Sequence, residues 1–90
     1  MLFRSGDDAS SNRLRQLARE AFDRWQSILA EALRREGVSH ARARRLAALA
    51  VASIEGTVAM CRAERSVGPL DDVLVELEAA FKSALAGVRE

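Results

Sequence analysis

The chain has 90 residues, of which 49% are hydrophobic and 30% charged, and its formal net charge is +1. This balance is typical of a globular domain and excludes an intrinsically disordered chain. A chain of this length buries only about 60–65% of the surface that its unfolded form exposes, so its own core is thin and a partner would add to it.

The first predicted helix covers residues 11–36. Residues 1–9 are predicted to form a flexible N-terminal arm, which leaves residues 10–90 as the folded domain. Ser10 or Ser11 can cap the helix, and Gly37 ends it as the residue that tolerates a left-handed turn. Apolar residues recur at spacings of three and four, which predicts one broad apolar stripe. Its members are Leu14, Leu17, Ala18, Ala21, Phe22, Trp25, Ile28, Leu29, Ala32 and Leu33.

The second predicted helix is capped by Ser39 and reaches about Arg65. Residues 46–52 within it are apolar on all sides, whereas a surface helix has a single apolar stripe. Three helices cannot enclose one of their own completely. We therefore expect something outside this chain to cover the second helix.

The third predicted helix follows the Gly68-Pro69 break, with Pro69 at its first position. Asp71 and Asp72 fall in its first turn, where the helix dipole favours acids. No strand pattern occurs. The predicted fold is all-α, with three long antiparallel helices. The third apolar stripe consists of Leu70, Val73, Leu74, Leu77, Phe81, Ala84, Leu85 and Val88.

The charges divide unevenly along the chain. Residues 1–45 hold ten arginines against six acids, while residues 46–90 hold four basic residues against seven acids. Five arginines flank the first turn and could meet phosphate, but a solvated corner is the favoured interpretation because no aromatic platform accompanies them. The helices are also too long for a helix-turn-helix DNA reader. These arginines are Arg34, Arg35, Arg42, Arg44 and Arg45.

No residue pattern predicts catalysis, a cofactor or a metal site. His40 is the only histidine, and Cys61, the only cysteine, has no histidine at helical spacing to activate it. A lone cysteine also excludes an internal disulfide. Phosphate loops, acidic metal pairs and nucleophile elbows are missing from the sequence. We therefore expect no enzyme.

Two sets of residues are candidates for binding. Phe22 and Trp25 lie three apart on one helix face, as either the wall of an apolar ligand pocket or ordinary core packing. Glu55 interrupts an apolar helix. It is either a polar contact inside a pocket or an interface, or an exposed acid on a narrow polar strip with Arg62. The predicted pocket comprises Phe22, Trp25, Leu29, Glu55 and Val58.

The predicted dimer interface combines the second and third helices. Ala52, Gly56 and Met60 share a face at spacings of four, and small residues there let another helix approach closely. The full set is Leu49, Ala52, Gly56, Met60, Leu70, Val73, Leu74, Leu77 and Phe81.

Several motifs occur in a fixed order between residues 17 and 85. They are Ala21-Phe22-xx-Trp25, Leu29, Leu33, Gly37, Ala47-x-Leu49-Ala50-Val51-Ala52-Ser53-Ile54-Glu55-Gly56, Arg62-Ala63-xx-Ser66, Pro69-Leu70-Asp71-xx-Val73 and Leu77. In this order they resemble the C-terminal domain of TetR-family transcriptional regulators. The resemblance covers about three-quarters of the chain.

The resemblance implies the function that we expect. TetR-family C-terminal domains pair through a four-helix bundle and hold a small inducer in an apolar pocket. The sequence lacks the N-terminal helix-turn-helix of the family, so we expect a fragment or a head-less relative without direct DNA binding. The expected function is a dimerisation and small-molecule-sensing module of a regulator. The alternative is a stand-alone helical protein-protein interaction module.

The sequence also predicts a location. Residues 1–3 are followed by charged residues rather than by an apolar core, so no secretory signal is recognisable. The longest uncharged run, residues 46–54, is far shorter than the roughly 20 apolar residues that span a bilayer. We therefore expect a cytoplasmic protein without a membrane partner.

Overall fold

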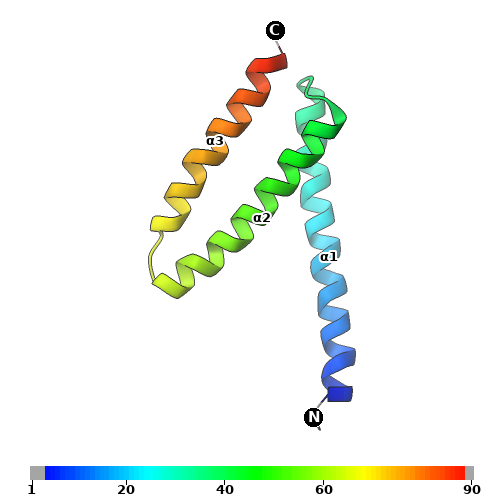
Figure 1. The fold of residues 1–90 in the computed structure, drawn as a ribbon. Helices are drawn as coiled ribbons and strands as arrows, with labels where there is room; N and C mark the ends of the chain where they lie inside the picture. The colour runs from blue at the N-terminus through cyan, green and yellow to red at the C-terminus, as the bar shows by residue number, and fades with distance from the viewer. Residues whose placement is uncertain (1–3, 89–90) are drawn as a thin grey trace.

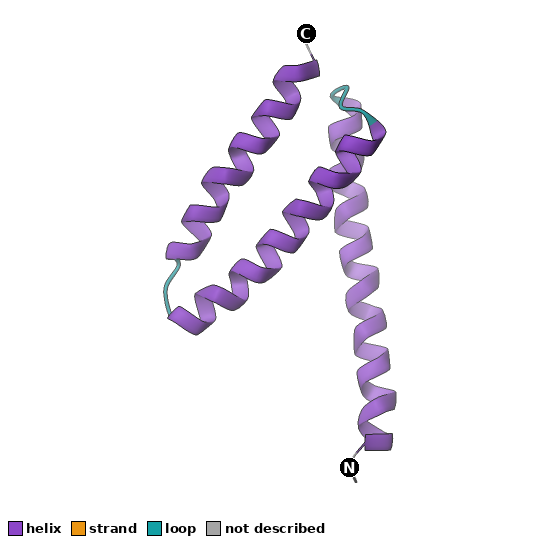
Figure 2. Cartoon of the chain, viewed as in Figure 1, coloured by secondary structure: helices purple, strands orange, loops and turns teal. Residues whose placement is uncertain are grey.

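A computed structural model describes residues 4–88 of the chain, with side chains from residue 9 onward. These residues form three helices, α1 (Arg4–Arg35), α2 (His40–Glu64) and α3 (Gly68–Val88), and no strand. Successive helices run in opposite directions, and short turns connect them (Figures 1 and 2). The predicted all-α class with three antiparallel helices is confirmed. Pairing with a second subunit stays a prediction.

The first helix begins earlier than the sequence pattern indicated. α1 starts at Arg4 rather than near Ser11, so residues 4–9, expected in the arm, are helical. Ser10 and Ser11 consequently lie inside the helix and do not cap it. The residues before them contain no proline to interrupt the hydrogen bonds, and acids near a helix N-terminus suit its dipole. Residues 1–3 of the predicted arm lie outside the described residues.

The turn between α1 and α2 follows the predicted local chemistry. Gly37 adopts a φ of 101°, which glycine tolerates and side-chain-bearing residues rarely do. Val38, which is buried, donates its N–H to the carbonyl of Leu33 at 3.1 Å. Ser39 caps α2, because its Oγ accepts a hydrogen bond from the N–H of Arg42 at 3.3 Å.

The turn between α2 and α3 is equally local. α2 ends at Glu64, and Arg65 adopts the left-handed conformation with φ 54° and ψ 45°. Ser66 Oγ then accepts a hydrogen bond from the N–H of Gly68 at 3.0 Å. The Gly-Pro break is confirmed, with α3 beginning at Gly68, one residue before the predicted Pro69.

The core lies where the C-terminal parts of α1 and α3 meet the N-terminal part of α2. α2 packs against both neighbours, while α1 and α3 scarcely touch each other. The N-terminal half of α1 projects away from the other two helices (Figure 1). The buried cluster consists of Ala30, Leu33, Val38, Ala43, Leu46, Ala47 and Ala84.

The apolar segment of α2 is covered on only part of its circumference. Leu46, Ala50 and Val51 are buried, whereas Ala48 and Ala52 are exposed and Leu49 is 48% exposed. The chain therefore does not enclose this segment by itself, as expected from three helices. That a second subunit covers the open side of α2 stays a prediction.

By length and composition alone, α2 could cross a membrane, because one 18-residue window reaches a mean hydropathy of 1.4. The short uncharged run in the sequence did not indicate this. A single helix of this kind is weak evidence for a membrane protein, since a helix packed between two others in a soluble domain has the same composition.

Replacing Gly37 with alanine tests the first turn. The left-handed backbone should cost about 1–2 kcal/mol for an alanine. The new Cβ would also lie 2.7 Å from Val88 Cγ1. Denaturant unfolding should show lower stability than the wild type. The control is Gly87→Ala, whose Cβ meets nothing within 4 Å, and which should equal or exceed the wild type. Unchanged stability of Gly37→Ala would contradict this account.

Candidate functional site

An apolar hollow lies between α1 and α2, farther from their connecting turn than the closest contact of the two helices. Its volume is about 190 Å³, and three of the five predicted pocket residues line it: Trp25, Leu29 and Glu55. The remaining lining residues were not predicted as pocket residues, because helical periodicity identifies an apolar face but not the point at which two helices separate. These are Ala50, Val51 and Ile54.

The aromatic pair marks the rim of this apolar hollow. Phe22 packs edge-to-face on Trp25, with ring centroids 5.9 Å apart and an interplanar angle of 64°. Trp25 nevertheless remains 47% exposed. Phe22 therefore contacts the indole, and the indole borders the hollow, while Phe22 itself does not line it. A ligand-binding role of this pair stays a prediction.

Glu55 and Val58 do not behave as buried pocket residues in this chain. Glu55 borders the apolar hollow but is exposed, and no ion pair joins it to Arg62 among the described side chains. Val58 lies elsewhere, in a second hollow of about 470 Å³ at the corner of α2 and α3. That corner hollow is lined by Thr57, Val58, Cys61, Arg62, Arg65, Ser66, Val67 and Leu70.

A groove between α2 and α3 brings together part of the predicted dimer interface. Leu49, Val73 and Leu77 line it together with Ser53, Asp72 and Glu76, and its volume is about 350 Å³. Polar residues therefore flank its apolar centre. We call it the α2–α3 groove.

The other predicted interface residues are distributed over several surfaces. Leu70 lines the corner hollow, Phe81 packs against the core, and Leu74 is 45% exposed but does not line the α2–α3 groove. On α2, Ala52 and Gly56 are exposed, and Met60 is 49% exposed. That all nine residues belong to one dimer interface stays a prediction.

Gly56 has an open side within this chain. A Cβ built there would meet nothing within 4 Å. Close approach by α1, one of the reasons that would explain glycine at this position, is therefore excluded. Two explanations for a glycine at this position are left: close contact with a second subunit, or simple exposure to solvent.

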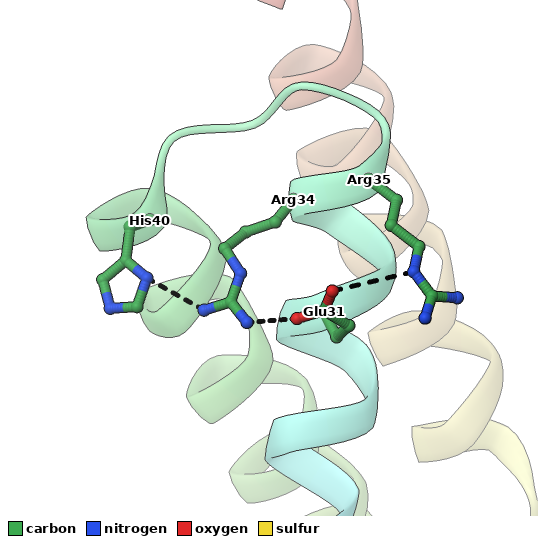
Figure 3. Close-up of polar contacts among 4 residues, drawn as sticks. All are labelled: Glu31, Arg34, Arg35 and His40. Carbon is green, nitrogen blue, oxygen red and sulfur yellow. Dashed lines mark hydrogen bonds and ion pairs between the residues drawn. The ribbon is translucent and has the colours of Figure 1, made fainter.

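Two of the arginines around the first turn, Arg34 and Arg35, form a polar network with Glu31 and His40 at one end of the molecule. Arg34 pairs with Glu31 and approaches His40, with 2.8 Å between Arg34 Nη1 and His40 Nδ1 (Figure 3). Arg35 Nε lies 3.6 Å from Glu31 Oε2. The hydrogen bond from Arg34, together with its charge, lowers the pKa of the Glu31 carboxyl, so this carboxylate stays ionised at neutral pH.

Catalytic geometry is not evident in the described residues. No group of three or more histidine, cysteine, aspartate or glutamate residues among them could hold a metal ion. Cys61 is half-buried in the corner hollow, and His40 lies on the surface next to Arg34.

Comparisons with known proteins agree on one family. The sequence profile of the C-terminal domain of LmrA/YxaF-like transcriptional regulators, a TetR-type domain, matches residues 3–76. Two uncharacterized HTH-type transcriptional regulators of Mycobacterium tuberculosis, from strains CDC 1551 / Oshkosh and ATCC 25618 / H37Rv, are each 36% identical over 70 residues. Each alignment covers 74% of this chain.

The chain spans only 36% of the length of these two relatives. No solved structure shows a significant match to it.

Proposed function

The chain belongs to the TetR family as a C-terminal domain of the LmrA/YxaF-like transcriptional regulators, and we propose that it is the dimerisation and small-molecule-sensing module of such a regulator. The observation that carries the proposal is the incomplete cover of α2. Its exposed apolar side flanks the α2–α3 groove, and an apolar hollow opens between α2 and α1.

The dimer half of the proposal rests on exposed apolar surface. Leu49 and Met60 are each about half exposed on α2, with the small residues Ala52 and Gly56 between them. Burying apolar surface contributes about 25 cal/mol for each Å² removed from water, so a second copy would stabilise a chain whose own core is thin. A two-fold interface would place this strip of α2 and the neighbouring flank of α3 against their copies.

The sensing half rests on the apolar hollow. Trp25 and Leu29 on α1 face Ala50 and Ile54 on α2 across it. A small apolar effector there would contact both helices and bias their separation. In a longer regulator, such a shift of α1 would change the spacing of DNA-binding domains that precede it. Regulators of this kind act in the cytoplasm, and direct DNA contact would belong to those domains.

A second candidate function uses the same surface. The open side of α2 and the α2–α3 groove would also accept an amphipathic helix of another protein. The chain would then act as a helical interaction module. The oligomeric state of the purified chain separates this function from self-association.

Gly56→Leu tests the dimer with little disturbance of the monomer. Apart from the backbone of its own helix turn, nothing lies within 4 Å of the new Cβ, and Gly56 is exposed, so a leucine there should not overpack the subunit's own core. If Gly56 faces a second subunit, overpacking should cost about 1–3 kcal/mol of dimer stability. Sedimentation on dilution should then show more monomer than the wild type shows.

Gly87→Leu is the matched control, because a Cβ there also meets nothing within 4 Å. This variant should dimerise like the wild type. A wild-type chain that sediments as a stable monomer at micromolar concentration would refute the dimer. A Gly56→Leu protein that stays fully dimeric would remove Gly56 from the interface.

Trp25 fluorescence tests ligand binding, since the chain has a single tryptophan and it borders the apolar hollow. A series of n-alkanols should shift its emission to shorter wavelengths with saturation. Affinity should rise about fourfold for each added methylene until the hollow is filled. Ile54→Asn should abolish the response. Ile28→Asn, at a position 61% exposed and away from the hollow, should preserve it. An equal response from both variants would show that the alkanols bind elsewhere.

Duplex DNA should bind this chain only weakly and without sequence preference, through the arginines of residues 34–45. Binding to DNA phosphates releases counterions. The logarithm of the binding constant should therefore fall linearly, and steeply, with the logarithm of the salt concentration. Fluorescence anisotropy with two duplexes of unrelated sequence, each at low and physiological salt, measures this. Tight binding of one sequence at physiological salt would contradict it.

A further inference from the structure

A polar groove lies between α1 and α2 at the end where the arginines gather, and its volume is about 440 Å³. It shares no lining residue with the apolar hollow of the proposed sensing function. Its lining residues are Asp23, Gln26, Ser27, Ala30 and Arg34 from α1, and His40, Arg44 and Ala47 from α2.

Helical spacing explains why these residues meet. His40, Arg44 and Ala47 follow one another at intervals of four and three, which places them on one face of α2. The α1 residues repeat in the same way. The two buried alanines, Ala30 and Ala47, lie at the close contact of the two helices and form the apolar floor of the groove. The polar side chains on either side of this contact form its walls.

Arg34 is held at one end of this groove by two partners. Glu31 pairs with it on α1, and His40 Nδ1 lies 2.8 Å from its Nη1 across the turn (Figure 3). A guanidinium only donates hydrogen bonds, so Nδ1 accepts in this contact, and the ring proton then lies on Nε2. The Nε2–H group is thus left as a donor of His40.

Arg44 is the charged group of this groove with the greatest unused capacity to donate. It lies one helical turn after His40 and has no hydrogen bond or ion pair with any side chain that the structure describes. A guanidinium binds a carboxylate or a phosphate through two parallel hydrogen bonds, which are stronger than neutral ones. Arg44 is exposed, so its guanidinium is accessible to an anion that enters the groove.

The opposite end of the groove limits the size of that anion. Asp23 precedes Arg34 by 11 residues on α1, which is about 16 Å along a helix. A chain of phosphates that continued along the groove would meet this carboxylate. A small molecule with one anionic group near Arg44 and a polar remainder near Gln26 and Ser27 fits the charges on both sides.

We propose that this groove binds a small organic anion, whose carboxylate or phosphate group is held by Arg44 with His40 and Arg34 as further donors. This site goes beyond the proposed function, since it requires neither dimerisation nor the apolar hollow.

Titration of the full chain with succinate and, separately, with inorganic phosphate tests the proposal. NMR spectra that resolve the arginine Nε–H groups follow each titration at an ionic strength held constant with sodium chloride. Saturable shifts should appear at Arg44 and Arg34 with at least one probe, and the stronger probe identifies a carboxylate or a phosphate ligand. Absence of saturation with both probes would overturn the proposal.

Charge-matched variants separate this groove from the arginine-rich corner as a whole. Arg44→Gln should weaken binding about tenfold, as expected for the loss of a hydrogen bond to a charged group. Arg44→Lys keeps the charge but loses the two parallel donors of the guanidinium. Its affinity should lie between those of the wild type and Arg44→Gln. Arg45→Gln removes the same charge from the neighbouring residue, which does not line the groove, and should bind like the wild type.

Two results would count against a small-anion site. Equal weakening in Arg44→Gln and Arg45→Gln would show diffuse attraction by the corner. Tighter binding of duplex DNA than of either probe, lost in Arg44→Gln, would assign the groove to nucleic acid. Circular dichroism confirms that each variant is folded. The Gly56 and Trp25 experiments test other surfaces, so failure here leaves the proposed function standing and the reverse also holds.

Discussion

The close contact of α1 and α2 next to their connecting turn is the constraint on which the rest of the structure depends. Ala43 and Ala47 are completely buried there, and Ala30 of α1 is nearly so. Small side chains let two helices approach closely. They also bury little apolar area, so this contact fixes the geometry of the helix pair while contributing modestly to its stability.

The two helices separate beyond this contact, and the candidate binding surfaces follow from that separation. Figure 1 shows α1 continuing past the end of its contact with α2. The radius of gyration, 16.9 Å, exceeds the roughly 12 Å expected of a compact domain of this length. Apolar side chains along the projecting part are consequently left open, among them Leu14 at 66% and Leu17 at 52% exposed. Such a chain has more apolar surface than it can cover by itself.

The same geometry separates apolar from polar binding surfaces. The hollow at Trp25 is bordered almost entirely by apolar groups, whereas the groove at Arg44 is bordered by charged and polar ones. Both lie between α1 and α2, and they share no lining residue. An apolar ligand and an anion would therefore act on the same helix pair through separate contacts, and each could alter its separation.

The sequence by itself determined the elements that depend on neighbouring residues. The left-handed turn at Gly37, the cap at Ser39 and the break at Gly68-Pro69 each involve atoms only a few residues apart, so local chemistry predicts them. The start of α1 was less certain for the same reason: a serine that can cap a helix can also lie inside one, and nothing local at Ser10 or Ser11 decides between the two.

Only the tertiary structure decided which residues of each apolar stripe come together. Trp25, Leu29 and Val58 were all predicted as pocket residues from the sequence. In the structure, Trp25 and Leu29 border one hollow together with Ile54, while Val58 lies in another. Leu74 and Val73 are adjacent in the chain, yet only Val73 lines the α2–α3 groove. The crossing point and rotation of the helices depend on side-chain volumes from both partners of each contact. Periodicity within one helix carries no information about them.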